Sequence, residues 1–220
     1  LFSLILLFRL QYGPGSDREV RILRFLFVLF IAMLAADAFR ALTEDSLVLL
    51  PRRLSALFSA VANTSLCGGC FCWFQFAAER SGLAFRRSRA WQTVLCLPLL
   101  AITVLNLLSV VFGPVFLIGG EGHGFESGLI WVQTGVEYLY IVLAAALSVR
   151  GAVRSETRRE KAVYLLYALF LPVSAAAGYF ESTYPYIPIV AFVSLLAVLL
   201  LFLSICVDRE KRILEQREQL

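Results

Sequence analysis

The sequence has little charge and few of the residues on which catalysis and metal binding depend. Of its 220 residues only 16% are charged, whereas 60% are hydrophobic, and the mean hydropathy is +0.79. Soluble domains typically have about 45–50% apolar and about 25% charged residues. This composition excludes a disordered chain, a nucleic-acid-binding domain and a disulfide scaffold, and it indicates an integral membrane protein.

Histidine and lysine are nearly absent, which excludes several kinds of site. The one histidine, His123, cannot form a His-based metal cluster, and it lies in a loop, away from any intramembrane serine chemistry. Neither lysine, Lys161 or Lys211, lies deep in an apolar stretch, so neither can carry a retinal Schiff base. No glycine-rich phosphate loop occurs. We therefore expect no catalytic residue, no metal and no cofactor in this chain.

Long hydrophobic runs fill most of the chain instead. Seven apolar stretches occur, at 1–8, 25–42, 54–78, 90–120, 127–149, 162–180 and 182–207. A membrane span needs about 20 apolar residues, so the first stretch is read as a truncated span, and Gly113 and Pro114 are expected to end the fourth early. The stretches do not alternate at period two as barrel strands do, so they are helices. The sequence predicts an all-α membrane protein, a bundle of seven transmembrane helices.

The basic residues are sorted between the two sides of the predicted bundle. Seventeen of the 20 lie in the segments 9–24, 79–89, 150–161 and 208–220, and the other three are Arg40, Arg52 and Arg53. Short loops rich in Lys and Arg stay in the cytoplasm. We therefore expect the N-terminus outside and the C-terminus in the cytoplasm of a bacterial cytoplasmic membrane, with the lipid bilayer, and no nucleic acid, as a partner.

Seven polar or aromatic residues are predicted to share a depth in the outer half of the bundle. Polar groups within spans usually face a bundle interior or a cavity. Gln133 and Glu137 are four residues apart and share a helix face. The functional interpretation is an outward-facing pocket for a small extracellular ligand that is cationic or donates hydrogen bonds. The predicted pocket residues are Asp37, Asn63, Asn106, Gln133, Glu137, Tyr179 and Tyr186.

Other interpretations of these residues stay open. Interhelical hydrogen bonds would account for the amides, and a belt of interfacial aromatics would account for the tyrosines. Asp37 and Arg40 are one turn apart and could form a local ion pair. A proton path is a third interpretation.

Three cysteines, Cys67, Cys70 and Cys72, lie close together in the third stretch. A CxxC spacing with a third cysteine suggests a redox or metal site. Thiolates are costly in the middle of a membrane, however, and small residues let helices pack closely. The favoured interpretation is packing.

The segment 208–220 lacks Gly and Pro, is rich in strong helix formers and carries a weak heptad pattern. It is read either as a solvated helix end or as a helix that leaves the membrane, pairs in a homodimer and transmits a signal. The residues assigned to that transmission are Val207, Ile213, Leu214 and Leu220.

The loop at 113–128, between the fourth and fifth apolar stretches, has the composition of a short hairpin.

Several stretches together carry a resemblance to a known family. They are LAADAFRAL, which contains Asp37, then FLIGGEGHGF, GVEYLYIVLAAALSVR and YALFLPVSAAAGYFESTYPYIPIVAF, followed by the charged exit helix. Their order resembles the N-terminal seven-helix sensor region of bacterial signalling proteins, which precedes a diguanylate cyclase (GGDEF) or histidine kinase domain. The resemblance implies a sensor domain at 1–207 and the start of a cytoplasmic signalling helix at 208–220. The alternative is a small transporter or channel-like protein.

Overall fold

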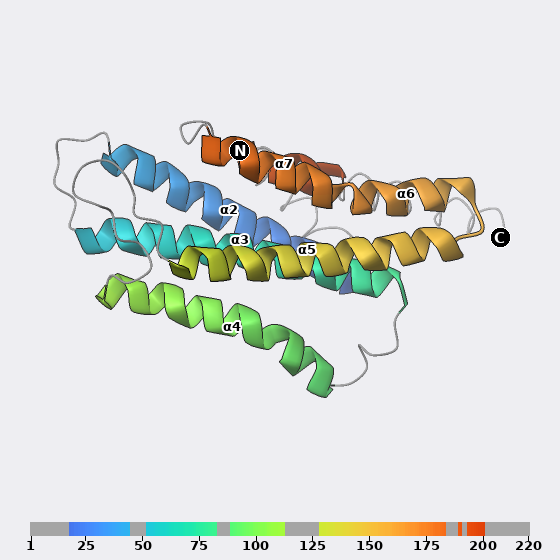
Figure 1. The fold of residues 1–220 in the computed structure, drawn as a ribbon, viewed down its shortest axis with the longest axis horizontal. Coiled ribbons are helices and arrows are strands. Elements are labelled where there is room, and N and C mark those ends of the chain that lie inside the picture. Colours follow the sequence, from blue (N-terminus) through green and yellow to red (C-terminus); the bar gives the residue numbers. More distant parts are fainter. Residues whose placement is uncertain are drawn as a thin grey trace, which may run out of the picture. The chain divides into compact units, whose positions relative to one another are not determined.

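The computed structural model is helical throughout nearly all the residues it describes, which are 18–44, 52–82, 89–112, 128–183, 189–190 and 193–200. No strand occurs among those residues, which confirms the prediction of an all-α chain. The helices are α2 (Arg18–Glu44), α3 (Arg52–Arg80), α4 (Arg89–Phe112), α5 (Gly128–Arg154), α6 (Arg158–Ala168) and α7 (Phe170–Thr183) (Figure 1).

Within the part of the chain that the structure describes, five helical stretches are long and apolar enough to cross a membrane. They are Glu19–Phe39, Ala56–Arg80, Ala90–Phe112, Trp131–Arg154 and Glu160–Phe180. Each overlaps one of the apolar stretches found in the sequence, and α4 ends directly before Gly113, as expected. Several predictions lie outside the described residues: the truncated first span, the hairpin at 113–127, and the exit helix with Val207, Ile213, Leu214 and Leu220.

The chain divides into two compact units, Leu1–Leu147 and Ser148–Leu220, with the boundary inside α5. In the first unit α2 packs along α3 in antiparallel orientation. At one end Arg80 Nε lies 3.9 Å from Glu19 Oε1. At the other end the rings of Phe39 and Phe58 stack with centroids 5.2 Å apart. The two contacts fix the register of this helix pair over its whole length.

Two glycines in the middle of α3 let α2 approach closely. A Cβ placed on Gly68 would lie 3.0 Å from Leu29 Cδ1, and one on Gly69 would lie 3.7 Å from Leu26 Cδ1. Small residues at a helix crossing allow backbones to come near one another, which increases van der Waals contact within a membrane. The predicted packing role of this part of α3 is consistent with that geometry.

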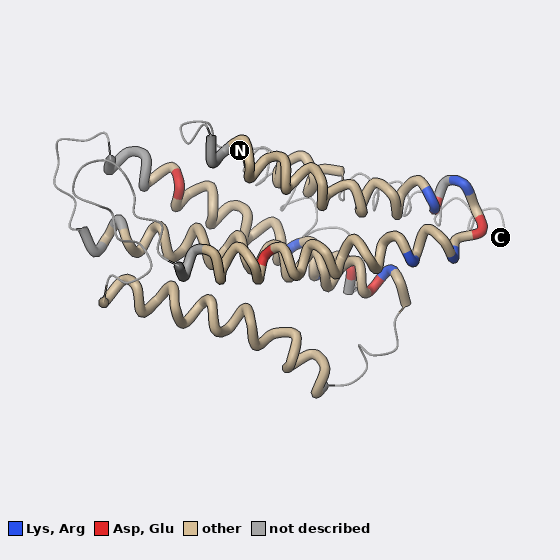
Figure 2. Tube along the Cα trace, viewed as in Figure 1, with Lys and Arg blue, Asp and Glu red and all other residues tan. Residues whose placement is uncertain are grey.

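The helix α4 packs on α3 by one face and leaves the other exposed. Ile102, Asn106 and Ser109 are buried, whereas Leu100, Val104 and other apolar side chains are more than half exposed. No charged residue occurs from Ala90 to Phe112, as Figure 2 shows. In a membrane this exposed face is suited to contact with lipid tails.

In the second unit the sixth predicted span is broken into α6 and α7. The break lies at Leu169, three residues before Pro172. Proline has no N–H and its ring crowds the carbonyl four residues earlier, so a helix kinks there. The Val173 amide still donates to the Leu169 carbonyl at 3.2 Å, and the two helices follow one another in Figure 1. The sequence analysis treated 162–180 as one uninterrupted helix and did not use Pro172.

Candidate functional site

The first half of α5 carries a hydrogen-bonded pair of polar side chains. Gln133 Nε2 donates to Glu137 Oε1 at 2.9 Å. Gln133 is 8% exposed and Glu137 is partly buried. The four-residue spacing predicted a shared face, and this contact confirms it. The second carboxyl oxygen of Glu137 makes no hydrogen bond with the other described residues.

A second polar contact joins α3 to α4. Asn106 Nδ2 donates to Thr64 Oγ1 at 3.1 Å, and the Asn106 side chain is almost completely buried, with 1% of it exposed. The Ser109 hydroxyl donates to the Asn106 carbonyl at 2.6 Å, so the turn around Asn106 is held within α4 as well. Asn63, a predicted pocket residue, is partly buried next to Thr64. Sequence analysis did not single out Thr64 as a pocket residue.

The two polar contacts are connected through one face of α3. Thr64, Cys67 and Cys70 are spaced three residues apart, so they follow one another along that face. Glu137 of α5 lies near Cys67 and Cys70 of α3. We call the side chains of Thr64, Cys67, Cys70, Asn106, Gln133 and Glu137 the intramembrane polar cluster. It brings three of the seven predicted pocket residues, Asn106, Gln133 and Glu137, onto neighbouring helices of the first unit.

Aromatic side chains follow the polar cluster along α3 and α5. The ring of Tyr140, one turn after Glu137, lies 5.3 Å from the Phe71 ring and 6.1 Å from the Phe74 ring, measured between centroids. The Tyr140 hydroxyl donates to the Leu95 carbonyl of α4 at 2.8 Å. Because these contacts follow the cysteines along α3 and Glu137 along α5, the two helices run parallel, with α4 antiparallel to both.

The remaining predicted pocket residues lie elsewhere or outside the described part. Asp37 is partly buried on α2, two residues before Phe39, whose ring stacks on Phe58. Phe58 precedes Thr64 by six residues, so Asp37 lies nearer that end of the α2–α3 pair than the polar cluster does. Asp37 makes an interaction of its own. The side chain of Arg40, its suggested ion-pair partner, is not among those described.

The two tyrosines of the predicted pocket do not add to the cluster. Tyr179 in α7 is 71% exposed, and its ring contacts that of Phe180 edge-on at 6.1 Å. An exposed tyrosine near a span end is typical of the aromatic belt at a membrane interface. Tyr186 lies outside the described residues.

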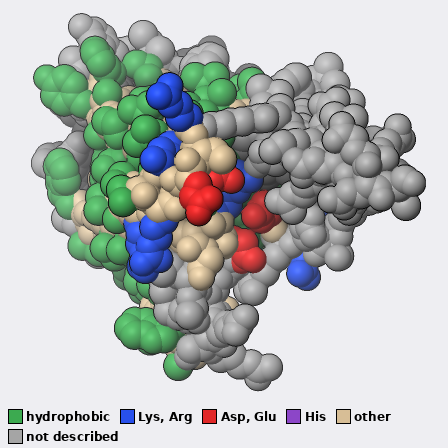
Figure 3. Space-filling view, turned by 90° about the vertical axis from the view of Figure 1, so that its right-hand side faces the viewer, with side chains coloured by type: hydrophobic (Ala, Val, Ile, Leu, Met, Phe, Trp, Pro, Cys, Tyr) green, Lys and Arg blue, Asp and Glu red, His purple; other side chains and the backbone are tan. Residues whose placement is uncertain are grey.

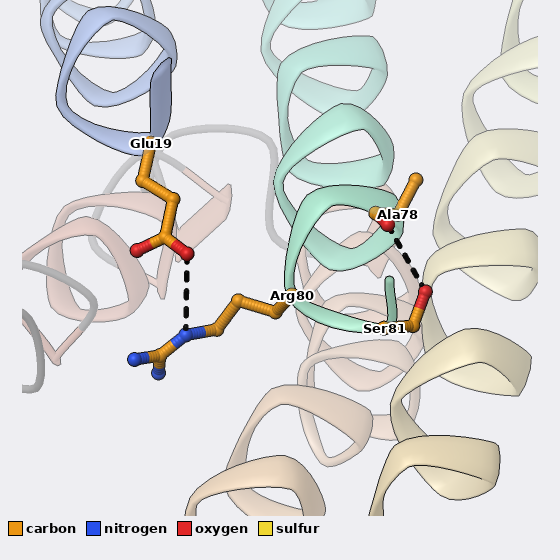
Figure 4. A network of polar contacts seen from close by, with 4 residues as sticks. All are labelled: Glu19, Ala78, Arg80 and Ser81. Carbon is orange, nitrogen blue, oxygen red and sulfur yellow. Dashed lines mark hydrogen bonds and ion pairs between the residues drawn. The ribbon is translucent and has the colours of Figure 1, made fainter. Parts of the chain in front are cut away.

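The opposite end of α2 and α3 carries a separate set of contacts that is structural in character. Besides its ion pair with Glu19, Arg80 places its guanidinium 5.9 Å from the centre of the Phe76 ring. The Ser81 hydroxyl donates to the Ala78 carbonyl at 3.1 Å and ends α3 (Figure 4). Sequence analysis did not foresee the pairing with Glu19, because it depends on the register of the two helices.

The cysteines of α3 are buried free thiols. Among the residues that the structure describes, no group of three or more His, Cys, Asp or Glu side chains is arranged to hold a metal ion. Their burial against neighbouring helices fits the packing interpretation of Cys67, Cys70 and Cys72.

Comparisons of the chain with protein-family models, with curated proteins and with solved structures find no match.

Proposed function

We propose that this chain is the transmembrane sensory input module of a bacterial signal-transduction protein, with Glu137 as the anchor of its ligand site. In this proposal the chain has seven spans, with its N-terminus outside and its C-terminus in the cytoplasm. The observation that carries the proposal is the Glu137 carboxyl group, which lies within the first half of the apolar stretch Trp131–Arg154 and accepts a hydrogen bond from Gln133 at 2.9 Å. Ionisable residues inside a membrane are costly and mark functional sites by default.

The chemistry around Glu137 selects the class of ligand. A carboxylate in a weakly polar environment attracts cations strongly, since charges are poorly screened there. Gln133 and the Asn106–Thr64 pair add neutral donors and acceptors on neighbouring helices. These groups suit a small organic amine, with its ammonium at Glu137 and further polar atoms toward the amides.

Signal transmission requires that the ligand favours one of two helix arrangements, because a ligand shifts an equilibrium only by its differential affinity. An ammonium group at Glu137 competes with the bond from Gln133, which lies one turn away in the same helix. The Tyr140–Leu95 hydrogen bond, one turn further along α5, connects a shift of α5 to α4. In the proposed module the change continues through the seventh span to the exit helix of a homodimer and to a diguanylate cyclase or histidine kinase domain.

Ligand binding is tested with the chain reconstituted in nanodiscs. Putrescine, choline and ethanolamine are added separately, and the fluorescence of tryptophan, including the buried Trp73, and the unfolding temperature are recorded. We expect saturable stabilisation by at least one amine, lost in Glu137→Gln. Thr103→Val is the matched control, since its hydroxyl bonds only to Leu99 of its own helix, at 2.8 Å. Saturable binding that survives Glu137→Gln contradicts the proposal.

The sensor assignment is tested separately from binding. Glu137→Gln is expected to abolish the response to the amine in cells while membrane insertion stays intact. The coding sequence after the Leu220 codon is expected to encode a GGDEF motif or a kinase histidine box. Flux of the amine across liposomes that hold the chain alone would instead support the transporter alternative.

A further inference from the structure

The turn between α5 and α6 carries exposed basic side chains on both of the helices it joins. Arg150 and Arg154 are one turn apart at the end of α5, and Arg158 and Lys161 lie in the first turn of α6. All four side chains are exposed. None of them forms an ion pair or a hydrogen bond with another described side chain.

The two helices that carry these charges touch one another next to the turn. A Cβ on Gly151 would lie 2.5 Å from Cε1 of the Tyr164 ring, so the ring packs directly against the α5 backbone. The Thr157 hydroxyl accepts from the Glu160 amide at 3.2 Å and fixes the first turn of α6. The basic pairs therefore flank a short turn of three residues, 155–157.

The position of the turn sets the depth of the charges in a membrane. Both Trp131–Arg154 and Glu160–Phe180 are long and apolar enough to span the bilayer, so the residues between them lie at its surface. Exposed apolar side chains adjoin the basic ones: Val153 is 77% exposed next to Arg154, and Leu165, 52% exposed, is one turn after Lys161. The space-filling view onto this end shows Lys and Arg side chains bordering hydrophobic ones (Figure 3).

We infer that the α5–α6 turn binds the phosphate-bearing headgroups of anionic phospholipids, with Arg150 and Arg154 on one side of the turn and Arg158 and Lys161 on the other. Arginine and lysine bind phosphate by charge-assisted hydrogen bonds, and acyl chains of the same lipid would lie along the apolar side chains beside them. Two exposed acids, Glu156 and Glu160, lie between the basic pairs and reduce the attraction. This inference rests on the membrane-spanning helices and does not depend on the ligand proposed for Glu137.

The test uses the full chain in an uncharged detergent and measures, by native mass spectrometry, the binding of phosphatidylglycerol and of phosphatidylcholine with identical acyl chains. Each basic residue near an anionic surface contributes about fivefold in affinity. The variant R150Q/R154Q/R158Q/K161Q is therefore expected to lose at least about tenfold of the preference for phosphatidylglycerol. R150K/R154K/R158K, which keeps the charge, is expected to retain the preference.

A second variant tests whether the preference for phosphatidylglycerol depends on charge, and it leaves every basic side chain in place. E156Q/E160Q removes the two acids, so it is expected to strengthen the preference for phosphatidylglycerol. A preference that is unchanged in both the fourfold glutamine variant and E156Q/E160Q overturns the inference. Millimolar inorganic phosphate is added in a further arm: retention of phosphatidylglycerol supports a lipid site, and full displacement overturns it in favour of a site for free phosphate.

Discussion

The hydroxyl of Tyr140 in α5 donates a hydrogen bond of 2.8 Å to the carbonyl of Leu95 in α4. The acceptor lies in the turn of α4 that contains Pro98. Proline removes one amide donor from that turn and its ring crowds the carbonyl of the preceding turn. The amide that Pro98 lacks would donate to the Val94 carbonyl, so Tyr140 bonds to the next carbonyl along the chain and connects α5 to the turn of α4 that proline weakens.

Removal of that hydroxyl is expected to destabilise the first unit measurably. Tyr140→Phe leaves the ring contacts with Phe71 and Phe74 in place and deletes only the hydrogen bond. A hydrogen bond of this kind contributes about 0.5–1.5 kcal/mol. The free energy of unfolding in mixed micelles is the measurement. Tyr138→Phe is the control, because the Tyr138 hydroxyl makes no hydrogen bond within the described residues. An equal loss of unfolding free energy in both variants would contradict the prediction.

The contact between Asn106 and Thr64 is expected to couple α3 to α4. A double-mutant cycle of Asn106→Ala and Thr64→Val should give a coupling energy near 0.6 kcal/mol and at most about 1.7 kcal/mol, the range for such bonds in membranes. The cycle is measured by unfolding of the four proteins in mixed micelles. Thr103→Val combined with Thr64→Val is the reference pair, expected to be additive, since Thr103 bonds within its own helix. Strict additivity for Asn106 and Thr64 as well would show that the contact contributes nothing.

Gly151 is expected to tolerate no larger side chain. Gly151→Ala places a methyl group within 3.0 Å of three atoms of the Tyr164 ring, so α5 and α6 must separate or the ring must move. Overpacking of this kind costs about 1–3 kcal/mol. Gly135→Ala, on the same helix, has no neighbouring atom within 4 Å and is expected to be neutral or stabilising. The unfolding temperatures of the two variants provide the comparison, and Tyr164→Ala is expected to rescue Gly151→Ala.

The orientation of the bundle is expected to place the α5–α6 turn in the cytoplasm. In a cysteine-free background, Glu156→Cys should react with a membrane-impermeant maleimide only after the cells are opened. Asp45→Cys, in the opposite set of loops, should react in intact cells. The reverse pattern would invert the orientation that the basic residues predict.

The sequence predicted those features that depend on residues near one another in the chain. The apolar stretches predicted the helices, Gly113 and Pro114 marked the end of α4, and a spacing of four residues predicted the contact between Gln133 and Glu137. The kink at Leu169 was equally visible, because Pro172 lies in the middle of a predicted span. These features follow from backbone chemistry and helical periodicity alone.

Features that depend on the register between helices could not be predicted. The partner of Asn106 is Thr64, 42 residues earlier, and nothing local in the sequence identifies it. Depth alone grouped Tyr179 with the pocket residues, yet its side chain is 71% exposed. Two residues at similar depth can face lipid or a neighbouring helix, and only the packing of the helices decides between these environments.

The role of Glu137 as a ligand anchor is tested most directly by infrared difference spectroscopy of the nanodisc-embedded chain with and without putrescine. We expect a carboxyl band that changes on addition of the amine, is absent from Glu137→Gln and is retained in Thr103→Val. An identical difference spectrum in wild type and Glu137→Gln would contradict the account, because the amine would then bind without contacting the Glu137 carboxyl group.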